Sequence, residues 1–345
     1  MAIFKAFGKN PSGSRLAQIA ESPQYRNGAF QNLSPTKLMA GNQSMVKNLW
    51  RFLNKPAATR PTRPVPVLKT DLKKISLKET TVVWFGHSSY FIRTNGLNIL
   101  VDPVFGGHAS PFPFGVSSFT GTDLYSVDDL PELDVLLITH DHYDHLDHRT
   151  IPGAAAKAKR VITSLGVGSH LVYWGIAAEK ITELDWYSSV QLLDAISLTA
   201  MPARHFSGRG FVRNQTLWSS FVLQAGEQVI YIGADSGYDV HFKNIGEEYG
   251  PFDLVILESG QYNENWPLIH MMPEQAVQAS LDLKAKLLLP VHWGKFALAL
   301  HPWDEPVKRV LEKAAELDMD VTTPMIGEPV ILGANYPRSN WWIGL

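Results

Sequence analysis

The sequence contains no cysteine, so disulfides cannot support the fold and thiolates cannot bind a metal. It has no uninterrupted run of about eighteen apolar residues, and residues 1–8 lack the apolar core of a signal peptide. We therefore expect no transmembrane span and a cytoplasmic location, with peripheral membrane contact left open. There is no excess of basic residues either, because 31 Lys and Arg stand against 33 Asp and Glu, a net charge of −2. This balance gives no reason to expect nucleic acid as a partner.

The length and composition are those of a globular protein with one large domain and an extension. The chain has 345 residues, of which 45% are hydrophobic and 19% are charged. We predict an N-terminal helical and extended arm over residues 1–75, which ends in a Pro-rich linker, and a main domain over residues 76–345. The oligomeric state is not specified by these features.

Within the arm, Ser34 followed by Pro35 is typical of the start of a helix. Such a helix would carry Leu38, Met39, Val46, Leu49 and Leu53 towards a core. We expect the arm to lie over the main domain or to lead into it. A membrane-surface element or a dimer element is the alternative for this segment.

The main domain begins with short β runs, and Asn95-Gly96 between two of them is a hairpin signal. Early hairpins that give way to strand–helix alternation indicate a layered α/β architecture rather than a single doubly wound sheet. Strands are predicted near residues 80–85, 89–93, 97–101, 134–138, 160–163, 189–201, 217–224, 227–232, 253–257 and 286–290. Helices are predicted over residues 167–174, 273–282 and 305–317.

Three histidines and two aspartates occur within residues 139–145, directly after the apolar run 134–138. A buried strand followed at once by His-x-His-x-Asp-His places imidazole and carboxylate groups on a tight loop at the end of a sheet. These groups together suit zinc, manganese or iron better than calcium or magnesium. Without a cation, such a cluster would be destabilised by repulsion and desolvation. The segment therefore predicts a metal site rather than a solvated polar turn.

Three further candidate ligands follow other apolar runs: His205, Asp235 and His292. Each alone is weak evidence, because a single histidine beside a strand is more often a hydrogen-bonded structural residue, and a Gly-Ala-Asp-Ser-Gly segment is often only a turn. All three nevertheless stand at strand ends, as the 139–145 cluster does. Ligands at one edge of a sheet can converge on one cleft.

The order and approximate spacing of these ligands resemble the metallo-β-lactamase superfamily. Several segments are also similar to its branch of N-acyl-phosphatidylethanolamine-hydrolysing phospholipase D and bacterial relatives. These segments are Trp84–Ser88, Asp102–Phe105, His140–Leu146, Gly233–Tyr238, Gly250–Asp253, His270–Ala276 and His292–Leu298. The arm carries far less of the likeness.

The resemblance implies an αββα sandwich, a layered α/β fold with two divalent metal ions between the loops of the two sheets. By position, one ion would be bound by His140, His142 and His205. The other would be bound by Asp144, His145 and His292, with Asp235 bridging both. Asp102 would orient the ligand loop by hydrogen bonds. Zinc is the favoured metal, and the same donors also accept manganese or iron.

The resemblance also implies a catalytic site. Two ions would lower the pKa of a shared water and place hydroxide in line with an electrophile. Asp144 and Asp235 would act in catalysis as well as in ligation, and His270 would bind the anionic group or protonate the leaving oxygen. A polar residue ahead of a helix is the structural alternative for His270. Further candidates near the substrate are His87, Tyr143, Arg204 and Arg209.

The leading functional hypothesis is a dinuclear metal-dependent hydrolase, a phosphodiesterase that acts on phospholipid-like or N-acyl-phosphatidylethanolamine-like substrates through the bridging hydroxide. A lactonase on the same fold is the enzymatic alternative, because fold and metal site do not choose the substrate. A non-catalytic metal-binding protein is a third hypothesis, disfavoured by the complete set of ligands. The expected partner is thus a small-molecule or lipid phosphodiester.

Overall fold

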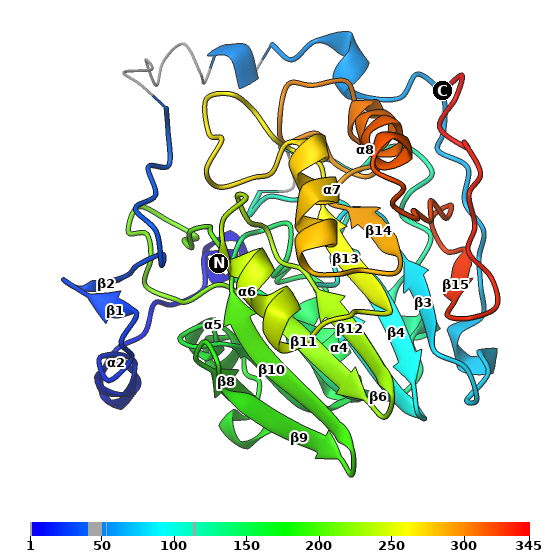
Figure 1. Ribbon diagram of the computed structural model, residues 1–345. Coiled ribbons are helices and arrows are strands. Elements are labelled where there is room, and N and C mark those ends of the chain that lie inside the picture. The colour runs from blue at the N-terminus through cyan, green and yellow to red at the C-terminus, as the bar shows by residue number, and fades with distance from the viewer. Residues whose placement is uncertain (1, 41–49, 53, 113–114) are drawn as a thin grey trace.

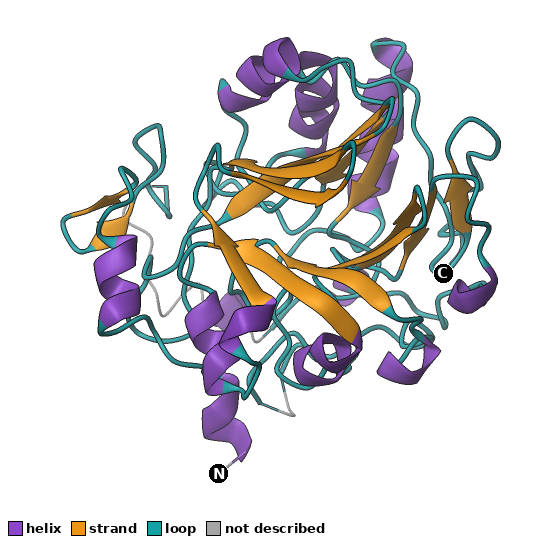
Figure 2. Ribbon diagram, turned by 90° about the horizontal axis from the view of Figure 1, so that it is seen from below, coloured by secondary structure: helices purple, strands orange, loops and turns teal. Residues whose placement is uncertain are grey.

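The computed structural model describes residues 2–40, 50–52, 54–112 and 115–345. Two β-sheets are stacked face to face, and helices cover their outer faces (Figure 2). The predicted layered α/β class and the αββα order of layers are both confirmed. Among the described residues, no helix is long and apolar enough to cross a membrane.

The first sheet contains seven strands, and its first half is built from hairpins. In sheet order the strands are β15 (Pro329–Ile331), β3 (Thr81–Trp84), β4 (Tyr90–Thr94), β5 (Leu97–Val101), β6 (Leu133–Ile138), β7 (Ala158–Ser164) and β8 (Ile181–Leu184). The hairpin predicted at Asn95-Gly96 is confirmed, since Thr94 pairs with Leu97 across it. From β5 to β8 the strands run parallel.

The second sheet contains six strands and combines both pairing modes. In sheet order they are β14 (Leu288–Val291), β13 (Leu254–Glu258), β12 (Gln228–Ile232), β11 (Ser219–Ala225), β10 (Ile196–Pro202) and β9 (Ser189–Leu193). The strands β9 to β12 are antiparallel neighbours, and β12 to β14 are parallel. Because β10 and β12 are both antiparallel to β11, they point in the same direction.

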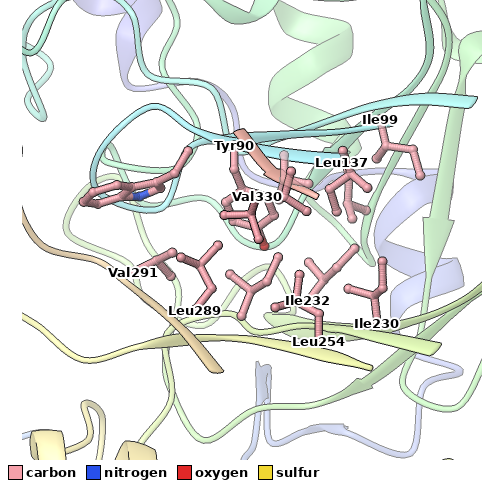
Figure 3. Packing of buried hydrophobic residues seen from close by; sticks show 14 of the residues in the cluster. Tyr90, Ile99, Leu137, Ile230, Ile232, Leu254, Leu289, Val291 and Val330 are labelled. Carbon is pink, nitrogen blue, oxygen red and sulfur yellow. The ribbon is translucent and has the colours of Figure 1, made fainter. Parts of the chain in front are cut away.

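The strand alternation of side chains divides the core into layers. In β6, Val135 and Leu137 pack between the sheets, whereas Leu136 and Ile138 pack under the outer helices of the first sheet. Side chains of the two sheets meet in the centre, as shown in Figure 3 by Tyr90, Ile99, Leu137 and Val330 on one side and Ile230, Ile232, Leu254, Leu289 and Val291 on the other.

The helices bury their apolar faces against the outer faces of the sheets. On the first sheet these are α4 (Ile151–Lys157) and α5 (Gly168–Tyr173), and on the second α6 (His241–Glu248), α7 (Pro273–Asp282) and α8 (Glu305–Glu316). The prediction for α7 is confirmed at both ends, and the predictions for α5 and α8 are correct to within one residue at each end. The helices α4 and α6, which are short and each contain a glycine, were not predicted from the sequence. Gly246 in α6 has a packing reason, because a Cβ there would lie 2.0 Å from the carbonyl oxygen of Asp282 in α7.

The arm contains short elements along the outside of the two-sheet body (Figure 1). They are α1 (Ala2–Ala6), α2 (Ser14–Ile19), a ribbon of β1 (Tyr25–Arg26) and β2 (Ala29–Phe30), and the 3₁₀ turns η1 (Ala57–Thr59) and η2 (Leu72–Lys74). Two more 3₁₀ turns lie in the main domain, η3 (Val127–Asp129) and η4 (Ala178–Lys180). The Pro-rich segment is packed rather than free, because the Val65 amide donates to the Thr120 carbonyl and its side chain is buried in the central core.

The helix predicted to start at Ser34 is wrong over residues 33–40. Residues 33–40 are non-helical, residues 41–49 and residue 53 lie outside the described residues, and residues 50–52 are helical. Backbone groups that would form hydrogen bonds within a helix are bound to the main domain instead. The carbonyl of Pro35 accepts from Arg204, and the amide of Ala40 donates to the carbonyl of Asn265. Tertiary contacts thus override the local helix signal.

Replacing Leu137 with alanine is expected to lower the free energy of unfolding by about 2–5 kcal/mol, because the fully buried side chain leaves a cavity between the sheets. Denaturant unfolding followed by circular dichroism measures the change. Leu193→Ala in the edge strand β9, where half of the side chain is exposed, should shift it by less than about 0.5 kcal/mol. Equal effects of the two substitutions would contradict the assignment of Leu137 to the central core.

Candidate metal centre

All seven side chains expected to bind metals lie at one edge of the stacked sheets. They follow four strands that point in the same direction within their sheets, with His140, His142, Asp144 and His145 after β6, His205 after β10, Asp235 after β12 and His292 after β14. Because the carboxyl ends of such strands meet at a common edge, residues far apart in sequence converge there.

One group contains three imidazoles and a carboxylate. Nε2 of His140 lies 3.0 Å, and Nε2 of His205 3.2 Å, from Nδ1 of His142. An oxygen of Asp235 lies 3.8 Å from Nε2 of both His140 and His205. Atoms bound to one ion at about 2.0–2.2 Å can be at most about 4.4 Å apart. These four atoms are therefore grouped closely enough to bind a single ion.

A second group lies directly beside the first. Its members are His87, Asp144, His145 and His292, whose candidate ligand atoms all lie within 4.8 Å of one another. Nε2 of His145 is 3.5 Å from Oδ2 of Asp144. Asp235 also reaches this group, with Oδ2 3.2 Å from Nε2 of His145 and Oδ1 3.1 Å from Nδ1 of His292. The carboxylate of Asp235 thus stands between the two groups.

The hydrogen bonds of the outer ring nitrogens show that lone pairs point inwards. Nδ1 of His205 donates to the carbonyl of Ile269, so Nε2 carries the lone pair. The Thr139 hydroxyl donates to Asp102 and can only accept from Nδ1 of His140, which leaves Nε2 of His140 unprotonated. Three or more lone pairs converging on one point cannot satisfy one another, whereas a cation would satisfy them all.

The neighbouring His145 supports the same conclusion. Nδ1 of His145 lies 2.7 Å from Oδ2 of Asp102, and its Nε2 is buried without a hydrogen-bond partner. A buried imidazole nitrogen that faces two carboxylates and has no hydrogen bond is a suitable metal ligand. The residues present therefore fit a pair of divalent metal ions.

The electrostatics of the cluster favour a bound cation. Burial, aided by neighbouring imidazoles, lowers the pKa of His140, His205 and His292, which keeps these rings in the neutral form that binds metals. Burial also lowers the pKa of His145, but the carboxylates of Asp235 and Asp144 outweigh it and raise that pKa well above its usual range. The carboxylates thus demand positive charge at this position, which a metal ion would supply.

Asp102 fixes the start of the ligand loop from behind. Its carboxylate accepts from the Thr139 amide at 2.8 Å and from the Thr139 hydroxyl at 2.6 Å, and it also contacts Nδ1 of His145. The residue is buried and has a positive φ of 40°, a conformation that Asp tolerates better than most residues. One side chain therefore orients both the loop backbone and a candidate ligand.

Replacing Asp102 with alanine is expected to weaken metal binding by about 10–100-fold, because partners that orient a ligating histidine typically have effects of this size. Titration of the metal-free protein with Zn²⁺ measures the change, and activity should return in part at high metal concentration. Asp194→Ala, at an exposed position between β9 and β10, is the control and should bind metal like the wild type. Unchanged affinity in Asp102→Ala would contradict the orienting role.

His270 joins the edge from the loop after β13. Its Nδ1 lies 2.7 Å from Oε2 of Glu258, the buried last residue of that strand. The other oxygen of Glu258 accepts from the amides of Ser236 and Met271. Burial lowers the pKa of His270, but the charge of Glu258 outweighs it and raises that pKa. The charge of Glu258 therefore favours the protonated form of His270 beside the ligand groups.

The other predicted substrate residues lie elsewhere around the site. His87 is fully buried, and its Nε2 is 2.8 Å from Oδ2 of Asp144, so it contacts a candidate ligand. The Tyr143 hydroxyl donates to the carbonyl of Arg209, whose guanidinium is itself buried against carbonyl groups. Arg204 binds Thr36 and Pro35 of the arm and lies near Asp239. None of these four side chains lines the pocket that opens over the two ligand groups.

A pocket of about 260 Å³ opens over the two ligand groups. Its lining combines polar side chains of the site with apolar ones. The lining consists of His142, Asp144, Asp235, Gln261, His270 and His292 with Arg213, Leu38, Met39, Phe206, Trp266, Ile269 and Leu298. A substrate bound here would contact both candidate metal ligands and apolar side chains.

Sequence reasoning missed several residues that support this site. Ser88 places its hydroxyl 2.8 Å from Nδ1 of His292, and Asn32 of the arm bonds the backbone of His205. Glu258 holds His270, and Gln261 accepts from the amides of Leu298 and Ala299 at the pocket wall. Two of these residues had a sequence signal: Glu258 follows an apolar run, as the candidate ligands do, and Ser88 lies in the family-like segment Trp84–Ser88.

Comparisons with known proteins agree with this fold. The family model described as "Beta-lactamase superfamily domain" matches residues 97–293. An uncharacterised protein of Mycobacterium tuberculosis is 38% identical over 342 residues, which cover 98% of this chain and 91% of that protein. N-acyl-phosphatidylethanolamine-hydrolyzing phospholipase D 1 of Caenorhabditis elegans is 30% identical over 268 residues, which cover 71% and 74%. A solved metallo hydrolase of Ignicoccus hospitalis shares the fold, with a TM-score of 0.58 and 18% identity over 75% of this chain and 100% of that one.

Two stacked sheets with outer helices, and clusters of histidine and aspartate at their common edge, are characteristic of metal-dependent hydrolases. More specifically, the chain belongs to the metallo-β-lactamase superfamily. The resemblance noted from the sequence motifs is thereby confirmed at the level of the superfamily.

Proposed function

We propose that the protein is a dinuclear metal-dependent phosphodiesterase that hydrolyses phospholipid-like substrates of the N-acyl-phosphatidylethanolamine type. The observation that carries this proposal is the pocket, whose lining combines the candidate metal ligands and His270, a histidine whose pKa is raised by Glu258, with apolar side chains. An anionic diester with an apolar chain is complementary to such a surface. The relative from C. elegans, which is named for hydrolysis of that lipid class, supports the same substrate.

The chain's own residues supply binding, orientation and protons. Divalent metal ions at this site would supply a water of lowered pKa and neutralise charge that develops on a phosphoryl oxygen. Asp144 is held by Nε2 of His87 and lines the pocket, so its carboxylate is placed to orient an attacking water. Glu258 occupies Nδ1 of His270, which leaves Nε2 for the substrate. From there His270 can bind the anionic diester and protonate the leaving oxygen.

A substrate panel tests the proposal. Protein loaded with Zn²⁺, Mn²⁺ or Fe²⁺ is assayed on N-acyl-phosphatidylethanolamine in mixed micelles, on bis(p-nitrophenyl) phosphate and on acyl and sugar-phosphate lactones. We expect turnover of both phosphodiesters with release of phosphatidic acid from the lipid, and loss of turnover after removal of metal with a chelator. Turnover of lactones alone would overturn the phosphodiesterase in favour of a lactonase.

A further inference from the structure

The N-terminal arm contributes side chains to the pocket. Leu38 and Met39 are among its lining residues, although they precede the first strand of the main domain by about forty residues. Every other lining residue comes from a loop that follows one of the strands β6, β10, β12, β13 or β14. The arm therefore supplies a wall that the strand-end loops do not provide.

Hydrogen bonds tie the arm to the site on both sides of this wall. Before it, Asn32 donates from Nδ2 to the His205 carbonyl at 2.8 Å and accepts the His205 amide at 3.0 Å through Oδ1. After it, the amide of Ala40 donates to the carbonyl of Asn265 at 2.7 Å. Asn265 precedes the pocket residue Trp266, and His205 is a candidate ligand. Both attachments are therefore made to the site itself.

A third attachment lies next to the wall. The guanidinium of Arg204 donates to the hydroxyl of Thr36 and to the carbonyl of Pro35, each at 2.9 Å. Pro35 further limits the backbone by its fixed φ. With attachments at 32, at 35 and 36, and at 40, the backbone on both sides of Leu38 and Met39 is held beside the pocket.

The chemistry of the wall indicates what it recognises. Leu38 is half-buried, Met39 is 37% exposed, and neither offers a charge or a strong hydrogen-bonding group. They share the pocket with Trp266, Ile269 and Leu298, and its charged lining residues all belong to the loops that follow the strands. An apolar chain attached to the reacting group would remove these side chains from water, which a short polar substituent cannot do.

We propose that the arm segment 32–40 determines substrate specificity, with Leu38 and Met39 forming the surface that binds the apolar chain of the substrate. The choice of phosphorus-containing probes rests on the proposed function, but the position of the wall does not. Leu38 and Met39 act on chain recognition, and the ligand groups act on the reacting centre.

The binding test uses two probes that cannot be hydrolysed, methylphosphonate and decylphosphonate, titrated calorimetrically into the metal-loaded full chain. We expect the wild type to prefer decylphosphonate and Leu38→Ala/Met39→Ala to lose about tenfold or more of that preference, with methylphosphonate affinity unchanged. Leu33→Ala is the matched control, because Leu33 is an exposed arm residue outside the pocket lining and should keep the wild-type preference.

A second variant tests the proposal even if the double alanine variant does not fold. Met39→Glu places a charge on the wall at a partly exposed position, so the fold should tolerate it while decylphosphonate binding falls. An equal loss of affinity for both phosphonates would show that the arm only supports the site, and would overturn the proposal. An unchanged preference in both variants, or a wild type that binds neither phosphonate, would overturn it too.

The activity test separates this proposal from the function proposed above. The kcat/KM values for methyl and hexyl p-nitrophenyl phosphate are compared in the same variants, and only the hexyl ester should lose about tenfold. If the wild type hydrolyses neither ester, the phosphodiesterase proposal fails. The phosphonate preference then still decides whether Leu38 and Met39 recognise an apolar chain.

Discussion

Replacing Asp235 with alanine is expected to lower kcat/KM for phosphodiester hydrolysis by about a thousandfold or more. The carboxylate lies within 3.2 Å of His145 and His292 and 3.8 Å from His140 and His205, so its removal takes a donor from both ligand groups at once. Loss of the ions would forfeit several kcal/mol of charge stabilisation in the transition state. The measurements are steady-state kinetics and metal content by plasma mass spectrometry, which should fall below two ions per chain.

Asp320→Asn is the matched control for this change. Asp320 is an exposed aspartate that pairs with Arg338 at the surface, where ion pairs contribute little. Its activity and metal content should equal those of the wild type. Near-wild-type turnover and two bound ions in Asp235→Ala would contradict the role of Asp235. Full metal content without activity in the wild type would instead favour the non-catalytic alternative.

The positions of the candidate ligands could be predicted from the sequence because the direction of a strand determines the edge of the sheet at which its last residues lie. His205, Asp235 and His292 each follow an apolar run, and parallel strands place such positions at a common edge. The structure brings all three beside the 139–145 cluster. What the sequence could not give is which ring nitrogen faces inwards, because that depends on partners such as the carbonyl of Ile269.

The residues that hold the ligands were harder to foresee. Ser88 contacts His292 across 204 positions, and Asn32 bonds His205 across 173. Apart from the family-like segment that contains Ser88, no local pattern distinguishes this serine or this asparagine from one in an ordinary turn. Contacts of this kind arise only after the sheets have stacked, so a single sequence carries no signal for them.

In the arm, contacts with the main domain override a local helix signal. Ser34 followed by Pro35 is a good helix start in isolation, yet the backbone from 33 to 40 is non-helical. Arg204 and Asn265 of the main domain form hydrogen bonds with this non-helical segment. The interpretation of the arm as a segment lying over the main domain agrees with these contacts, and they leave Leu38 and Met39 at the pocket.

Replacing His270 with alanine is expected to lower kcat by about 10²–10⁴-fold, the usual contribution of a general acid. The loss should be larger for a substrate with an alkoxide leaving group than for a p-nitrophenyl ester, because p-nitrophenolate needs no proton. His270 also lies near Asp235, Glu258 and His292, so metal content must be measured alongside and should stay at two ions per chain. His148→Ala, a half-buried histidine outside the pocket lining, is the control.

A substitution of Glu258 tests whether His270 acts as a proton donor or only fills space. Glu258→Gln keeps an oxygen acceptor but removes the charge that raises the pKa of His270, so it should reduce kcat less than His270→Ala does. The two changes act on one unit, and the double variant should be no slower than His270→Ala alone. Additive losses would show that Glu258 acts independently of His270. A rise in KM with unchanged kcat in His270→Ala would instead assign that residue to binding of the anionic diester.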